Sequence, residues 1–123
     1  MSTKVLIVDD EKDFLDIMAE RMVARGMEVS TACSAEDARE MVKVESYDAV
    51  IMDFLMPEMD GFTALKLLKE TRPNLPIILL TANVREEECI AAKKLGAMDV
   101  LEKPADLNLL TQKIEAAKAL RNK

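Results

Sequence analysis

Short apolar runs alternate along this chain with segments in which apolar residues recur at every third or fourth position. Continuous runs are typical of strands buried in a sheet, whereas the longer spacing indicates amphipathic helices. The runs lie at residues 4–8, 28–32, 48–52, 76–80 and 97–102. The apolar stripes of the helical segments begin at Phe14, Ala38, Phe62, Val84 and Leu107. The pattern predicts five strand–helix repeats, written (βα)5, within a single domain over residues 1–123.

The boundaries of these helical segments carry residues that suit helix ends. Ser34 and Asp106 precede helical segments, and their side chains can accept hydrogen bonds from N–H groups of the first turn. Gly26 and Gly96 follow helical segments and can adopt the left-handed backbone that ends many helices. Residues 57–61 combine a proline with an Asp-Gly pair, which predicts a loop and turn before the third helix.

Strands that alternate with helices predict an α/β fold, in which a doubly wound parallel sheet is covered by helices on both faces. The first, third and fourth strands are apolar on both faces and suit the centre of the sheet. The second strand, at residues 28–32, is more polar, and the fifth, at residues 97–102, is mixed, so both suit the edges. The predicted five-stranded order is therefore 2-1-3-4-5, the flavodoxin-like order.

Composition narrows the class of protein further. Half of the residues are hydrophobic, which predicts a folded core, and the net charge of -6 argues against binding to nucleic acid. The chain has no apolar run long enough to span a membrane, and its first ten residues indicate a strand rather than a signal peptide. Cys33 and Cys89 match no metal-binding spacing, so we expect two reduced thiols in a cytoplasmic protein.

The chain contains no histidine. Catalytic triads built on histidine and most zinc sites are thereby excluded. Any chemistry that involves a phosphohistidine would need the histidine of another protein.

Acidic residues stand where two central strands end. Asp9 and Asp10 follow the first strand, and Asp53 follows the third. In this strand order the winding direction reverses between these two strands, and ligands bind beyond the strand ends at such a reversal. Three carboxylates brought together would repel one another unless a cation were present. Oxygen ligands of this kind suit Mg²⁺, which we predict as the cofactor.

The fourth and fifth strands bring two more polar groups to the same edge. Thr81 supplies a hydroxyl, and Lys103, which precedes Pro104, supplies a positive charge. Together with the acids, these groups can stabilise a phosphoryl group on Asp53, whose carboxylate would be the nucleophile. Each motif alone has a simpler interpretation: Asp9 and Asp10 as a solvated strand end, Thr81 as a helix cap, and Lys103-Pro104 as a turn.

The motifs together resemble the response-regulator receiver domain of two-component signalling, over residues 4–121. They are VDDE at 8–11, M-D-x-x-M-P-x-M-D-G at 52–61, LTA at 80–82 and KP at 103–104. Each motif is weak alone, but all four occur in order and at strand ends. The resemblance implies a signalling protein that promotes its own phosphotransfer and dephosphorylation and is not a conventional enzyme.

The resemblance also implies roles for particular residues. Asp53 would be the phosphoacceptor and would share Mg²⁺ with Asp10, a direct ligand, and Asp9, a ligand through water. The backbone carbonyl of Leu55 would complete the protein's ligands to the metal. Lys103 would pair with the phosphoryl group or with Asp53.

Thr81 would move toward a phosphoryl oxygen and report its arrival, while the small Ala82 would leave the site accessible. The donor would be a histidine kinase or a histidine phosphotransfer protein. The output would be a changed protein–protein contact on the fourth helix, fifth strand and fifth helix, read by a downstream protein or by an output domain.

Some residues depart from the family pattern. Receivers usually carry an aromatic residue three positions before the lysine, and this chain has Val100 there, so we predict an altered or weaker switch. Leu55 cannot orient a water and Asn83 is no base, so we predict that spontaneous dephosphorylation is not among the fastest in the family.

Two other classes of function stay open beside the phosphoacceptor switch. A phosphatase with an aspartate nucleophile would need a second acid two residues later, where this chain has Leu55. An adaptor that uses the receiver fold without phosphorylation is encouraged by Val100 but is undercut by the complete set of acids, hydroxyl and lysine.

Overall fold

The computed structural model describes residues 2–104 and 106–121; of the predicted domain over 1–123, residues 1, 105, 122 and 123 lie outside this description. The strands are β1 (Lys4–Val8), β2 (Glu28–Ala32), β3 (Ala49–Asp53), β4 (Leu55–Met56), β5 (Met59–Asp60), β6 (Ile77–Thr81) and β7 (Asp99–Glu102). The helices are α1 (Lys12–Ala24), α2 (Ala35–Val44), α3 (Gly61–Thr71), α4 (Glu86–Lys94) and α5 (Leu107–Arg121). No helix among the described residues is long and apolar enough to cross a membrane.

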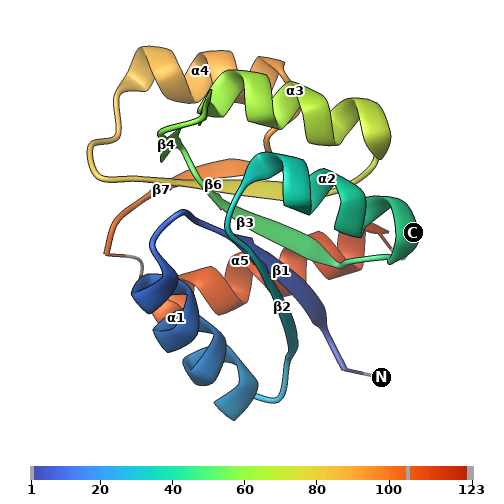
Figure 1. Cartoon of the computed structure of the whole chain (residues 1–123). Coiled ribbons are helices and arrows are strands. Elements are labelled where there is room, and N and C mark those ends of the chain that lie inside the picture. The colour runs from blue at the N-terminus through green and yellow to red at the C-terminus, as the bar shows by residue number, and fades with distance from the viewer. Residues whose placement is uncertain (1, 105, 122–123) are drawn as a thin grey trace.

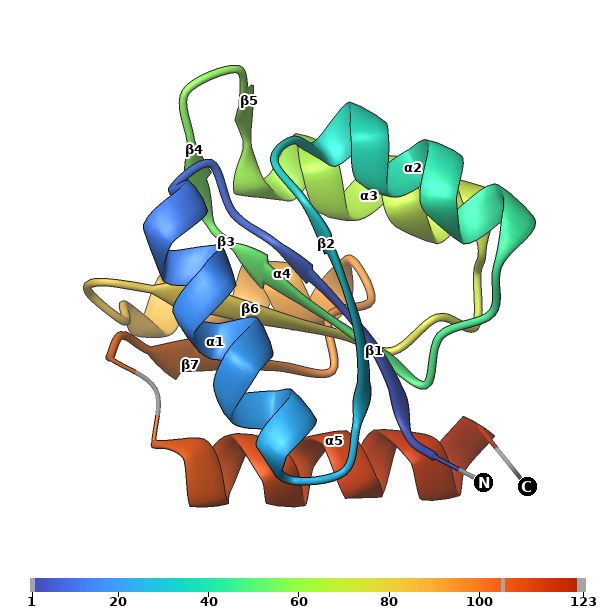
Figure 2. The same ribbon diagram turned by 60° about the horizontal axis from the view of Figure 1, so that its bottom comes forward.

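The main sheet of the described chain has five parallel strands in the order β2-β1-β3-β6-β7. Because β4 and β5 form a separate pair, this is the order 2-1-3-4-5 predicted for the strand–helix repeats. Helices α2, α3 and α4 cover one face of the sheet, and α1 and α5 cover the other (Figure 1). Figure 2 shows the two layers from a second direction, with α1 and α5 together on one side. The predicted doubly wound fold is confirmed.

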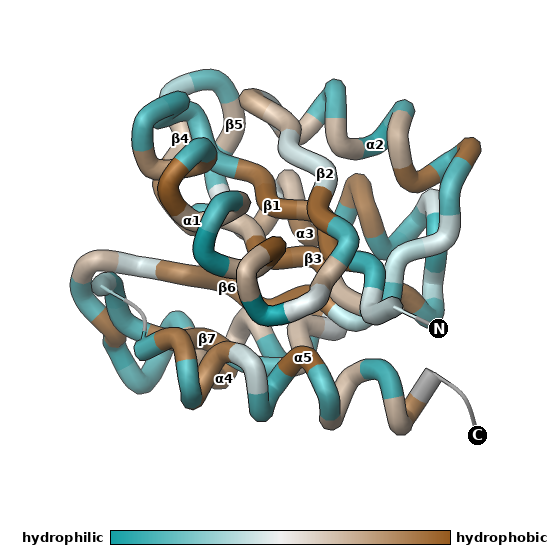
Figure 3. Tube along the Cα trace, turned by 90° about the horizontal axis from the view of Figure 1, so that it is seen from below, coloured by the Kyte–Doolittle hydropathy of each residue, from teal (hydrophilic) through white to brown (hydrophobic). Residues whose placement is uncertain are grey.

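The core is divided into two apolar clusters by the sheet. Strands β3 and β6 are buried along their whole length, as expected for central strands that have helices on both faces. Apolar residues are concentrated in β1, β3 and β6, whereas the helices show alternating apolar and polar faces (Figure 3). Strands β2 and β7 lie at the edges, where their polar residues are partly exposed.

The segment after β3 differs from the predicted loop. Leu55 and Met56 pair with Asp60 and Met59 in a short antiparallel hairpin, which projects from one end of the main sheet (Figure 2). Asp60 therefore does not form part of the turn with Gly61. Its carboxylate instead accepts hydrogen bonds from the N–H (3.0 Å) and the hydroxyl (2.8 Å) of Thr63, which makes Asp60 the N-cap of α3.

Most of the other predicted helix ends are confirmed. The Ser34 hydroxyl accepts the N–H of Asp37 at 3.1 Å, and Asp106 accepts the N–H of Asn108 at 2.8 Å. Gly26 and Gly96 both have positive φ, at 89° and 105°. Helix α4 begins at Glu86, two residues later than the apolar pattern suggested.

Candidate functional site

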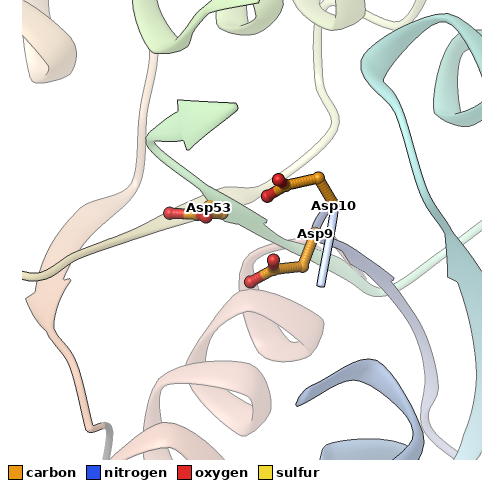
Figure 4. A group of neighbouring side chains, drawn as sticks. All are labelled: Asp9, Asp10 and Asp53. Carbon is orange, nitrogen blue, oxygen red and sulfur yellow. The ribbon is translucent and has the colours of Figure 1, made fainter. Parts of the chain in front are cut away.

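Three carboxylates meet at the end of the main sheet from which the hairpin projects. Val8 lies opposite Met52 in the β1–β3 ladder, so the residues that follow, Asp9 and Asp53, emerge side by side. One oxygen from each of Asp9, Asp10 and Asp53 lies within 4.8 Å of the others. Figure 4 shows Asp9 and Asp10 extending from the end of β1 toward the side on which Asp53 lies. The predicted convergence of the three acids is confirmed.

Lys103 lies between two of these carboxylates. Its ammonium is 2.9 Å from Oδ2 of Asp9 and 3.3 Å from Oδ2 of Asp53. The lysine reaches this position from the end of β7, where its backbone N–H donates to the carbonyl of Thr81 at 2.7 Å. All three ionic side chains are largely shielded from solvent, which strengthens their mutual attraction. Lys103 is thus part of the site.

Burial raises the pKa of the Asp53 carboxyl above its ordinary value, and the neighbouring charge of Asp9 adds to this effect. Two contacts oppose it: the N–H of Leu55 donates to Oδ1 of Asp53 at 3.2 Å, and Lys103 pairs with Oδ2. Asp53 is therefore an anionic group held in surroundings that disfavour its charge. The charged form of such a carboxylate is stabilised by a nearby cation.

The environment of Lys103 favours the charged form of its side chain, whereas that of Asp53 disfavours the charged form. Burial alone would lower its pKa, but its bonds to Asp9 and its proximity to Asp53 outweigh burial, and the pKa lies above the ordinary value. The ring of Phe14 lies beneath the ammonium, with its centroid 4.4 Å from Nζ. Lys103 is consequently a fixed positive charge at this end of the sheet.

Thr81 ends β6 and is buried, with its hydroxyl at the same edge. Its Oγ1 lies 3.4 Å from both the N–H and the carbonyl oxygen of Asn83, so its local bonds are long. It does not cap α4, because the N-cap residue of that helix is Arg85. The structure therefore favours a role for Thr81 at the strand edge over the alternative role as a helix cap.

A small cavity lies beside Thr81. It is lined by Phe54, Thr81, Arg85, Glu88, Ala92 and Val100. Val100, at the position where receivers usually have an aromatic ring, lies in edge strand β7 and is partly buried against the core. The altered switch at Val100 stays a prediction.

The donor set fits the predicted metal ion. Carboxylate oxygens are hard ligands of the kind that Mg²⁺ prefers, and Asp10 is exposed, so water can complete the coordination. The role of the Leu55 carbonyl stays a prediction; the same residue's N–H orients Asp53. The side chain of Leu55 is 65% exposed, so most of it faces solvent.

Sequence reasoning missed the place of Phe14. Its spacing assigns it to the buried stripe of α1, yet the structure also places its ring beneath Lys103, far along the chain. A pairwise contact between the first turn of one helix and the end of a distant strand leaves no periodic signal. The one sequence signal for this contact is an aromatic residue a few positions after the Asp9-Asp10 pair.

Comparisons with known proteins agree with this geometry. Residues 5–115 match the family model of the response regulator receiver domain. The transcriptional regulatory protein ZraR of Salmonella typhimurium is 36% identical over 115 residues, which cover 94% of this chain and 26% of ZraR. The chain spans 26% to 44% of the length of the curated relatives that it first matches.

Solved structures show the same fold. A response regulator receiver domain protein from Clostridium thermocellum superposes with a TM-score of 0.90 at 31% identity, covering 98% of this chain and 97% of that one. The beryllofluoride-activated NtrC4 receiver domain dimer superposes with a TM-score of 0.86 at 27% identity, covering 94% and 96%.

Proposed function

This chain belongs to the response regulator receiver domain family, and from that premise we propose that it is a phosphoacceptor switch whose acceptor is Asp53. The observation that carries the proposal is the position of Lys103, whose ammonium lies 3.3 Å from the Asp53 carboxylate and 2.9 Å from Asp9. A carboxylate with an adjacent fixed cation and two neighbouring acids is suited to accept a phosphoryl group.

The transfer follows from the chemistry of the donor and acceptor. An oxygen of Asp53 attacks the phosphorus of a phosphohistidine on a partner protein and forms a P–O bond. The P–N bond breaks, and its electron pair returns to the imidazole nitrogen of the donor. Because this chain contains no histidine, the donor belongs to another protein, a histidine kinase or a histidine phosphotransfer protein.

Each residue of the site has its own role in the proposed phosphoryl transfer. The Leu55 N–H holds one Asp53 oxygen, while Lys103 attracts the negative oxygens of the incoming phosphoryl group. Asp9, Asp10 and Asp53 would hold Mg²⁺, which when bound supplies positive charge against the phosphoryl oxygens. Thr81 offers a hydroxyl whose present bonds are long and easily exchanged.

The consequence of transfer would be a changed contact surface on α4, β7 and α5. Its reader would be a downstream protein or an output domain, because response regulators such as ZraR are much longer than this chain. We place this exchange in the cytoplasm. The chain would act as a signalling protein that promotes its own phosphorylation and dephosphorylation, without the substrate turnover of a conventional enzyme.

The test is phosphorylation of the purified protein by acetyl phosphate, measured by intact mass, or binding of beryllofluoride, followed by NMR. With Mg²⁺ we expect one added phosphoryl group, which is absent in Asp53→Asn and in buffer with a chelator. Asp48→Asn is a matched control, because Asp48 is also a buried aspartate but accepts the Lys4 N–H (2.8 Å) beside the opposite end of β3.

The same experiment separates the switch from the adaptor that keeps the fold without phosphorylation. An adaptor would show neither added mass nor shifted resonances, even with Mg²⁺ and excess phosphodonor. Modification that persists in Asp53→Asn would place the acceptor elsewhere and contradict the proposal.

A further inference from the structure

The ammonium of Lys103 has a third neighbour besides the two carboxylates. The ring of Phe14, in the first turn of α1, has its centroid 4.4 Å from Nζ of Lys103. An ammonium within about 6 Å of a ring centroid is attracted by the negative face of the ring, and the attraction grows when the pair is shielded from solvent. Only 19% of the Lys103 side chain is exposed, so this pair is well shielded.

We propose that Phe14 is a positioning residue, whose ring holds Lys103 between Asp9 and Asp53 and so sets the efficiency of phosphorylation. This inference rests on the proposed function of Asp53. It assigns to α1 a part in the chemistry that acts through Lys103, in addition to its packing against the sheet.

The geometry explains why a support is needed. Lysine has a flexible four-carbon chain, and its ammonium can rotate among many positions. Asp9 and Asp53 attract it from the side of the acids, but both are expected to bind a metal, which would weaken their hold on the lysine. The Phe14 ring is not a metal ligand. It therefore attracts the ammonium whether or not the carboxylates are engaged.

Helix α1 is itself fixed to the same cluster. The N–H of Glu11, the N-cap residue of α1, donates to Oδ1 of Asp9 at 2.9 Å, while Oδ2 of Asp9 contacts Lys103. Phe14 also packs against the apolar cluster beneath α1. The ring is thus anchored by the core on one side and by the start of the helix on the other.

The variants Phe14→Leu and Phe14→Tyr separate positioning from packing. Leucine keeps an apolar side chain but removes the ring, whereas tyrosine keeps the ring. We expect the initial rate of phosphorylation by acetyl phosphate with Mg²⁺ to fall about fivefold in Phe14→Leu, which converts to ~1 kcal/mol. Phe14→Tyr is expected to retain the rate of the unsubstituted protein.

A second readout does not depend on phosphorylation. Protons of the Lys103 ε-methylene, close to the ring face, are expected to resonate upfield in NMR spectra of the metal-free protein. The upfield shift is expected to disappear in Phe14→Leu and to persist in Phe14→Tyr. Thermal unfolding of each variant checks that the fold is retained.

The outcomes are distinct. If the unsubstituted protein is not phosphorylated but the upfield shift is present, the proposed function fails while the contact stands. If Phe14→Leu is phosphorylated as fast as the unsubstituted protein, or faster, the positioning role is overturned. The same holds if Phe14→Tyr is as slow as Phe14→Leu although both variants are folded.

Discussion

The ring and the carbonyl of Phe54 lie directly against the Cα of Gly61. A β-carbon built on Gly61 would approach the Phe54 carbonyl oxygen to 2.6 Å and would overlap the ring still more closely. The first residue of α3 thus contacts the residue next to Asp53, and only glycine fits there. This contact sets the path of the chain from the acceptor, through the hairpin, to the third helix.

Gly61→Ala is expected to lower the free energy of unfolding by ~1–3 kcal/mol, the usual cost of inserting a methyl group into a packed region. Chemical denaturation checks the magnitude. The steric cause predicts that shrinking the facing side chain, in Gly61→Ala with Phe54→Leu, recovers part of the loss, although the carbonyl contact would remain. A fully additive double variant would contradict this cause.

Gly26 offers a matched control, because a β-carbon there would meet no atom within 4 Å. Its φ of +89° makes the cost conformational instead of steric. We expect Gly26→Ala to cost ~1–2 kcal/mol and Gly26→Asn less, since asparagine tolerates the left-handed region better than alanine. Equal losses in the two variants would show that the backbone conformation is not the cause.

Asp53→Asn is expected to change the response of the protein to Mg²⁺. A metal present at about 100 times its dissociation constant stabilises a protein by ~2.7 kcal/mol, and removal of one ligand should abolish most of that gain. Thermal unfolding with and without Mg²⁺ measures the difference, with Asp48→Asn as the control. An equal gain from Mg²⁺ in Asp53→Asn and in the unsubstituted protein would refute the metal site.

In metal-free buffer, Asp53→Asn is expected to raise the unfolding temperature. The pKa of Asp53 is raised in the folded protein, so the stability that the group contributes is lost as pH rises from 3.8 through the folded value. At neutral pH the ionised carboxylate is therefore destabilising, and the amide removes that cost. The stabilisation should disappear when both proteins are compared below pH 3.8, where Asp53 is protonated in either state.

Asp99 joins two elements of the predicted output face. Its carboxylate is 2.7 Å from Nζ of Lys113 in α5 and 3.7 Å from Nζ of Lys93 in α4. Burial would raise its pKa, but the bond to Lys113 and the Val100 N–H outweigh burial and hold it below 3.8. The resulting stability is present above pH 3.8 and is lost as pH falls through the depressed folded value.

We expect Asp99→Asn to lower the free energy of unfolding at pH 7 by ~1 kcal/mol, with the difference shrinking below pH 3.8. A double-mutant cycle with Lys113→Gln measures the pair directly by chemical denaturation. A coupling energy near zero at pH 7 would show that the contact does not stabilise the fold.

The phosphorylated protein is expected to persist for minutes, because neither Leu55 nor Asn83 can act as a base toward an attacking water. Leu55→Glu should shorten its lifetime by roughly tenfold, since positioned bases can contribute more than that. Leu55→Gln, which cannot take a proton, is the control. The side chain of Leu55 is 65% exposed, so neither change should disturb folding. Loss of phosphate within seconds from the unsubstituted protein would contradict this prediction.

The sequence predicts the location of those site residues whose position along a strand determines their position in space. Asp9, Asp53, Thr81 and Lys103 each follow or end a strand of a parallel sheet, so topology alone brings them together. The sequence does not predict the hairpin after Asp53, because two-residue strands carry no periodic pattern and residues 57–61 have the composition of a loop.

The sequence also does not predict contacts between residues that lie far apart along the chain. The bond between Arg72 and the carbonyl of Val42, at 2.7 Å, and the Phe14–Lys103 pair depend on where helices pack, which periodicity does not specify. Asp-Gly pairs favour turns, so the sequence predicts a turn at Asp60, but the geometry of the hairpin makes this residue a helix cap.

Methionines lie in both apolar clusters of the core, so their methyl groups can serve as NMR probes of each cluster. Met52 and Met56 belong to the cluster on the side of α2 and α3, whereas Met18, Met22 and Met27 belong to the cluster on the side of α1. Labelling the methionine methyl groups with carbon-13 would give separate signals from the two layers. The spectra would then show on which side of the sheet the protein rearranges when Asp53 is modified, without any substitution or chemically attached probe.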